Sequence, residues 1–232
     1  MKNTFNNPRF TLLHFPLIAI GSFILLLICA STFYPGGTVN NPETIRYIFS
    51  ENYISDLGRV ETPSGVKNVP SVFIFIIALL IMSFSFFLYF YNNYRFYKNK
   101  YSINSSTFKL GSFFGLCFSL CFLGVAITPA DVNLNDHIIY AEWLFRFLFG
   151  CSFLLFIAFY KINKSTFSLS IGYFLIAFSN GVYILLSDFK LISLIFNDVH
   201  YANVISQKII TISLILGFVF VGYFNNRILK QK

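Results

Sequence analysis

Six long apolar runs divide this chain into seven polar segments, and this alternation restricts the possible folds more than any other feature. The runs cover residues 12–33, 69–92, 108–128, 137–160, 166–187 and 203–224. Each is long enough to cross a bilayer as a helix, which takes about 20 predominantly apolar residues. Each must be helical, because a lone strand would leave its backbone N–H and C=O groups unpaired in lipid. The sequence therefore predicts an all-α, polytopic membrane protein whose six transmembrane helices form one antiparallel bundle, with residues 1–232 as a single domain.

The charged residues are sorted between the two sides of this predicted bundle. The alternate segments, after runs one, three and five, contain the acidic residues Glu43, Glu51, Asp56, Glu61, Asp131, Asp136, Asp188 and Asp198, with Glu142 just inside the fourth run. The other segments contain no Asp or Glu, and hold Lys2, Arg9, Arg95, Lys98, Lys100, Lys109, Lys161, Lys164, Arg227, Lys230 and Lys232. Lysine and arginine concentrate on the cytoplasmic side. We therefore expect both termini in the cytoplasm and the acidic segments on the outer face of the plasma membrane.

The composition limits the partners of the chain. Of its 232 residues 56% are hydrophobic and 11% are charged, so six spans leave no room for a separate soluble domain. The net charge of +8 is spread over short segments beside apolar runs, which suits contact with anionic lipid headgroups and predicts no nucleic-acid partner. We expect membrane lipids as partners, and leave open a protein partner or a homo-oligomer.

The longest connection covers residues 34–70 on the predicted outer side. Pro35, Gly36 and Gly37 end the first helix, and Pro63-Ser64-Gly65 is typical of a turn. Between them apolar side chains recur at helical spacing, at Ile45, Ile48, Phe49 and Tyr53. The spacing predicts a short amphipathic helix lying in the membrane interface.

Polar groups with possible chemistry concentrate on the same outer side. Asp56, Asp131, His137 and His200 are the candidate catalytic residues, because an imidazole beside a carboxylate can act as a general base. The same four side chains could supply the ligands of a zinc ion. Such a site would have to be assembled from three loops, since no HxxxH or HxxE spacing joins these residues. We expect no metal and no cofactor.

Glu142, Arg146 and Lys208 lie inside the spans, where charge is costly and indicates function by default. Glu142 and Arg146 are four residues apart on one helix face and can neutralise each other. Lys208 is placed to reach Glu142 or Asp188. A transporter would use these groups along a polar path, but the spans lack the paired Gly/Pro breaks that transport folds place near the midplane.

The segment Ile54-Ser55-Asp56-Leu57-Gly58 resembles an element of the DRAM-like (damage-regulated autophagy modulator) membrane proteins and their uncharacterised bacterial and archaeal relatives. That group has six spans, a long first outer loop with an Ile-Ser-Asp-x-Gly element, and a histidine opening the fourth span. The corresponding stretch here runs from Gly124 through Pro129 and Asp131 to His137, followed by Ala141 and Phe145. The resemblance implies lipid handling, including remodelling of lipid anchors and regulation of membrane phosphoinositide systems. It also implies an association with autophagy.

These observations favour a membrane protein that binds lipid or a protein partner through the outer polar cluster. The candidate binding residues are Ser55, Asp56, Gly58, His137, Glu142 and Arg146. The first alternative is a membrane-embedded lipid hydrolase or acyl transferase that uses Asp56, His137 and His200. A small transporter is the second alternative. Whether the chain is an enzyme is left open by the sequence.

Overall fold

The computed structural model describes residues 4–103, 105–160 and 162–231, so Lys2, Lys161 and Lys232 lie outside the described residues. Its elements are η1 (Thr4–Asn6), η2 (Phe10–His14), α1 (Phe15–Phe33), η3 (Ile54–Gly58), α2 (Val69–Tyr101), α3 (Ser106–Ile127), α4 (Leu134–Tyr160), α5 (Lys164–Asp188), α6 (Leu191–Ile195) and α7 (Val199–Lys230). Six helices, with α1 extended by the π-helical η2, are long and apolar enough to cross a membrane. The predicted all-α fold with six spans is confirmed.

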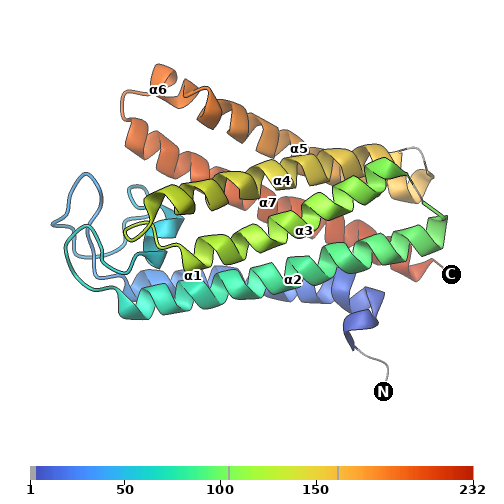
Figure 1. The fold of residues 1–232 in the computed structure, drawn as a ribbon, viewed down its shortest axis with the longest axis horizontal. Coiled ribbons are helices and arrows are strands. Elements are labelled where there is room, and N and C mark those ends of the chain that lie inside the picture. The colour runs from blue at the N-terminus through green and yellow to red at the C-terminus, as the bar shows by residue number, and fades with distance from the viewer. Residues whose placement is uncertain (1–3, 104, 161, 232) are drawn as a thin grey trace.

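The helices form one antiparallel bundle in which helices consecutive in the chain lie side by side (Figure 1). α1 packs on α2, α2 on α3, α3 on α4, α4 on α5 and α5 on α7, whereas α7 and α1 make few contacts. The connections 34–68, 128–133 and 189–198 lie at one end, which we call the loop end. Both termini lie at the other end, which we call the terminal end. The bundle is therefore least tightly packed where its first and last spans meet.

Several helices extend beyond the apolar runs from which they were predicted. α2 continues to Tyr101, nine residues past the predicted end at 92, and carries Arg95, Lys98 and Lys100 in this extension. Hydropathy detects only the part of a helix that suits lipid, whereas backbone hydrogen bonding continues through polar residues. The helix ends where Ser102 adopts a left-handed conformation with φ of 54°.

Aromatic rings fill the centre of the bundle. Phe86 of α2 lies with its ring centroid 4.5 Å from that of Phe218 in α7 and 5.3 Å from that of Phe118 in α3. Phe90 and Phe122 complete this cluster with edge-to-face contacts to Phe118. Large aromatic side chains reach across the bundle axis. They therefore connect helices, such as α2 and α7, whose backbones do not lie side by side.

A buried polar network holds the terminal half together. The hydroxyls of Tyr89 in α2 and Tyr173 in α5 are 2.7 Å apart, and Asn93 donates to the Tyr173 oxygen at 3.2 Å. Asn225 of α7 accepts from the Tyr97 hydroxyl at 2.6 Å and donates to the Leu12 carbonyl at 3.2 Å. Polar side chains in a span therefore join four elements here, as hydrogen bonds between membrane helices can.

The predicted interfacial helix in the first loop is wrong. Residues 45–53 form irregular backbone with bends at 46 and 52 and a turn at 49–51, and within residues 34–68, all of them described, η3 is the only helical segment. The side chain of Asn52 organises this segment: its oxygen accepts from the Ile48 N–H at 2.9 Å, and its NH₂ donates to the Gly37 carbonyl at 2.9 Å. Local side-chain bonds of this kind compete with helix formation. Ile45 and Phe49 stay exposed, at 82% and 63%.

Candidate functional site

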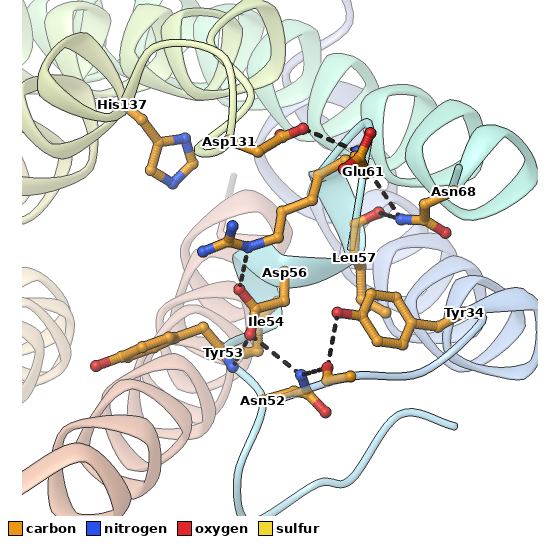
Figure 2. A network of polar contacts seen from close by, with 12 residues as sticks. Tyr34, Asn52, Tyr53, Ile54, Asp56, Leu57, Glu61, Asn68, Asp131 and His137 are labelled. Carbon is orange, nitrogen blue, oxygen red and sulfur yellow. Dashed lines mark hydrogen bonds and ion pairs between the residues drawn. The ribbon is translucent and has the colours of Figure 1, made fainter. Parts of the chain in front are cut away.

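The Asp56 carboxylate is the centre of the first loop at the loop end of the bundle (Figure 2). It is 1% exposed and accepts hydrogen bonds from the Tyr53 N–H at 2.8 Å and from the Asn52 amide at 3.3 Å. Its other oxygen pairs with the Arg59 Nε at 2.8 Å. These donors satisfy both oxygens, as a buried carboxylate requires. Asp56 therefore holds η3 in shape.

Further bonds fasten η3 and the residues that follow it to the connection between α3 and α4 and to the start of α2. Asp131, from the connection between α3 and α4, accepts from the backbone N–H groups of Val60 at 3.0 Å and Glu61 at 2.8 Å. Asn68 donates to the carbonyls of Leu57 at 3.2 Å and Arg59 at 2.9 Å. Gly58 at the end of η3 is required by packing, because a Cβ there would collide with the ring of Phe75 in α2. Asp131 and Gly58 thus position the loop.

One face of α7 holds the other side of the loop. The His200 Nε2 lies 2.8 Å from the Glu51 carbonyl, and the Gln207 side-chain oxygen accepts from the Ile54 N–H at 2.8 Å. The Lys208 ammonium donates to the Asn52 carbonyl at 2.6 Å and lies 4.9 Å from the centre of the Phe49 ring. The prediction that Lys208 reaches Glu142 or Asp188 is wrong, because the first loop covers this face of α7.

Three tyrosines of the loop region remain neutral, and two of them donate hydrogen bonds within the first loop. Burial raises the pKa of the Tyr34, Tyr47 and Tyr53 phenols, and the charge of Asp56 raises each of them further. The Tyr34 hydroxyl donates to the Gly37 carbonyl at 3.2 Å, and the Tyr47 hydroxyl donates to the Asn52 carbonyl at 3.2 Å. These phenols remain hydrogen-bond donors at neutral pH.

A cavity of about 300 Å³ that is lined by charged, polar and apolar residues, which we call the vestibule, lies between the loop, α4, α5 and α7. Its polar lining residues are Tyr53, Ser55, Asp56, Arg59, His137, Glu142, Arg146, Tyr183, Ser187, Asp188 and Gln207. Five of the six predicted binding residues are among them, and Gly58 is not. Asp131 and His200 also lie outside this lining. Among the described residues there is no group of three or more His, Cys, Asp or Glu side chains that could hold a metal ion.

Charged side chains cross the vestibule from α4 to α5. Arg146 pairs with Glu142 at 2.7 Å, as predicted from their spacing, and also with Asp188 at 3.0 Å. Asp188 ends α5, so the second partner could not be identified from spacing on one helix. With Asp56 and Arg59, the lining presents three carboxylates and two guanidinium groups.

His137 is held in one tautomer at the base of the vestibule. Its Nδ1 lies 2.7 Å from the Thr128 carbonyl, which can only accept, so Nδ1 carries the proton. The Nε2 lone pair is then the basic site of the ring, and in the described part of the chain no hydrogen bond to it is found. The ring is 6% exposed. A carbonyl that orients the ring in this way is the usual support of a basic histidine.

Below the vestibule lies an apolar cavity of about 130 Å³, which we call the interior cavity. It is lined mostly by aliphatic and aromatic side chains of α1, α2, α3, α4 and α7, including Phe118 and Phe218. Five residues line both spaces: Ser55, His137, Ala141, Phe145 and Gln207. A cavity with charged groups in its lining and an apolar cavity are therefore in contact around His137.

Several residues of this lining could not be recognised from sequence motifs. Arg59 and Gln207 gave no motif, although Gln207 is a polar residue inside a span, which is a recognisable signal. Comparisons with protein-family models, with characterised proteins and with solved structures find no match for this chain. The resemblance to the DRAM-like group stays a prediction, and the site is interpreted from its geometry.

Proposed function

We propose that this protein binds a membrane phospholipid, with the headgroup in the vestibule and an acyl chain entering the interior cavity. The observation that carries this proposal is that Ser55, His137, Ala141, Phe145 and Gln207 line both the vestibule, which contains charged groups, and the apolar interior cavity. Ligand sites are mostly apolar with a few convergent polar groups. A phospholipid has a charged headgroup joined to apolar chains, which matches a cavity with charged groups joined to an apolar one.

The charges of the vestibule favour a zwitterionic headgroup. Guanidinium groups such as those of Arg59 and Arg146 bind phosphate oxygens with two parallel hydrogen bonds. Glu142 and Asp188 are 45% and 37% exposed in their side chains, so they can also accept from an ammonium group. A headgroup that carries both a phosphate and an amine therefore suits this lining better than a purely anionic one.

The distribution of charged residues supports an orientation in which the loop end lies on the outer face of the plasma membrane. A single cysteine introduced at the exposed Asn40 should then react with a membrane-impermeant maleimide in intact cells. One at the exposed Lys98, at the terminal end, should not. The unaltered chain is the blank, since its four cysteines all lie inside spans. Labelling at Lys98 with protection at Asn40 would reverse the orientation.

Substituting Ala141 by leucine tests the lipid site. The larger side chain fills the contact between the two cavities, so the affinity for lysophosphatidylethanolamine should fall about tenfold or more, a loss of about 1.4 kcal/mol or more. The measurement is the rise in thermal unfolding midpoint with lipid concentration, since a ligand at about 100 times its Kd stabilises by about 2.7 kcal/mol. Ala158→Leu, on the same helix but outside both linings, is the matched control. An A141L protein that keeps the full shift would contradict the proposal.

The geometry of His137 supports a second candidate, a lipid hydrolase or acyl transferase with Nε2 as general base. Asp56 and His200 act in this structure through the bonds that hold the loop. Mass spectrometry of the lipid in the same binding experiment distinguishes the two functions. Turnover of the lipid that is lost in His137→Gln, with binding retained, would favour the enzyme. If the lipid is recovered without chemical change, the result favours the binding function.

A further inference from the structure

The interior cavity is too small to enclose an acyl chain. Its volume of about 130 Å³ is well below the roughly 300–1,000 Å³ of typical ligand pockets. Close packing of the surrounding rings leaves little room for expansion. A chain that enters the cavity must therefore leave it again on another side.

A crevice between α1 and α7 offers this second opening. It has a volume of about 230 Å³, and we call it the lateral crevice. Four residues line both this crevice and the interior cavity: Phe23, Ile54, Thr211 and Ile215. Ile24 and Ile28 of α1, with Ile212 of α7, form the outer part of the crevice, and these residues are 39–58% exposed. Both helices are spans, so this opening faces the hydrocarbon of the bilayer.

The packing of α1 and α7 explains why the crevice lies toward the loop end. Near the terminal end the two helices approach closely, where Gly222 lies against Leu13 and Leu17. Toward the loop end the first loop lies over the crevice, and Lys208 holds Phe49 and the Asn52 carbonyl there. Among the described residues that line the crevice, Lys208 is the one that carries a charge. The opening is thus apolar, with a polar rim at the loop end.

We propose that the lateral crevice is the site through which a phospholipid acyl chain passes from the bilayer into the interior cavity. The ligand class is the acyl chain of a bilayer phospholipid, and the identity of the headgroup end rests on the proposed function above. The lipid exchanges sideways with the surrounding membrane, and its chain lies between α1 and α7 while the headgroup occupies the vestibule. The continuity of the three spaces carries this inference.

Contact between bilayer chains and a buried residue tests the proposal. Phe118, 1% exposed, lines the interior cavity, whereas Phe108, 0% exposed and on the same helix, lines none of the three spaces. Each is replaced by tryptophan in a Trp143→Phe background, so that one indole reports. The proteins are placed in nanodiscs of phosphatidylcholine with brominated acyl chains, which quench indole emission near contact. We expect F118W to be quenched severalfold more than F108W, and Phe218→Trp provides the same test from α7 if F118W does not fold.

A pair of variants on α7 identifies the route. Ile212 lines the lateral crevice and is 52% exposed, whereas Ile209 is 59% exposed and faces a groove between α5 and α7. Adding Ile212→Phe should reduce the quenching of F118W toward that of F108W, because the ring fills the crevice. Ile209→Phe should leave the quenching unchanged.

Each result separates this inference from the proposed function. Equal quenching of F118W and F108W would overturn it, even if lysophosphatidylethanolamine still stabilises the protein. Equal effects of I212F and I209F would overturn the route between α1 and α7. Quenching of F118W that I212F removes supports the route, and it does so even where A141L shows that the headgroup site is elsewhere.

Discussion

Replacing Asp56 by alanine is expected to lower the free energy of unfolding by about 3 to 5 kcal/mol, the range for breaking a buried ion pair by removing one partner. The change strands three donors at once: the Tyr53 N–H, the Asn52 amide and the Arg59 Nε. Each buried donor without a partner costs about 1–3 kcal/mol. The Arg59 side chain is 20% exposed, so its Nε–H can form a hydrogen bond to water after the change. The cost of leaving this donor without Asp56 therefore lies in the lower part of that range.

Titration of the purified protein with SDS in mixed micelles measures this loss. Glu43 is an exposed carboxylate of the same loop, so Glu43→Ala should stay within about 0.5 kcal/mol of the parent. Arg59→Ala alone should cost less than D56A, and the double variant should cost less than the sum of the two, because the residues are in contact. A D56A protein as stable as E43A would show that the loop does not depend on the carboxylate.

Replacing Asn225 by leucine should have the second largest effect, about 3 kcal/mol. Its amide makes three hydrogen bonds, to the Tyr97 hydroxyl, the Leu12 carbonyl and the Tyr89 oxygen. Hydrogen bonds between membrane helices contribute about 0.6 kcal/mol on average and about 1.7 kcal/mol at most. Leaving the fully buried Tyr97 hydroxyl without its acceptor adds about 1–3 kcal/mol.

Asn226 is the matched control for this variant. It follows Asn225 in α7, and its buried side-chain oxygen has no hydrogen-bond partner among the described residues. Asn226→Leu should therefore be neutral or stabilising in the same SDS titration. If both leucine variants lose equal stability, the loss comes from the change in side-chain shape, and the network of Tyr89, Tyr97 and Asn225 contributes little.

The positions of the spans were predictable because hydropathy reports the one property that lipid selects. Every predicted run lies within or close to a helix of the structure, and the errors are at the helix ends. The interfacial helix failed for a different reason. Apolar spacing at Ile45, Ile48 and Phe49 matches a helix, but Asn52 bonds the backbone of Ile48 and Gly37 and stabilises turns instead.

The candidate site was predictable only in part. Ser55, Asp56, His137, Glu142 and Arg146 do line one vestibule. The bond of His200 to the Glu51 carbonyl and that of Asp56 to the Tyr53 N–H could not be foreseen, because both partners are backbone groups of the loop. Asp188 is 42 residues from Arg146 in the chain, and its pairing depends on how α5 lies against α4.

The sequence by itself determined the number of spanning helices, their antiparallel order and the segregation of charge, because each follows from the transfer of local segments between water and lipid. Only the tertiary structure decided that Lys208 holds the first loop and that an apolar cavity meets the vestibule at His137. It also decided that α1 and α7 leave a crevice near the loop end. Cavities and cross-chain bonds depend on how side chains from distant segments fit together, and no local free energy of transfer specifies that fit.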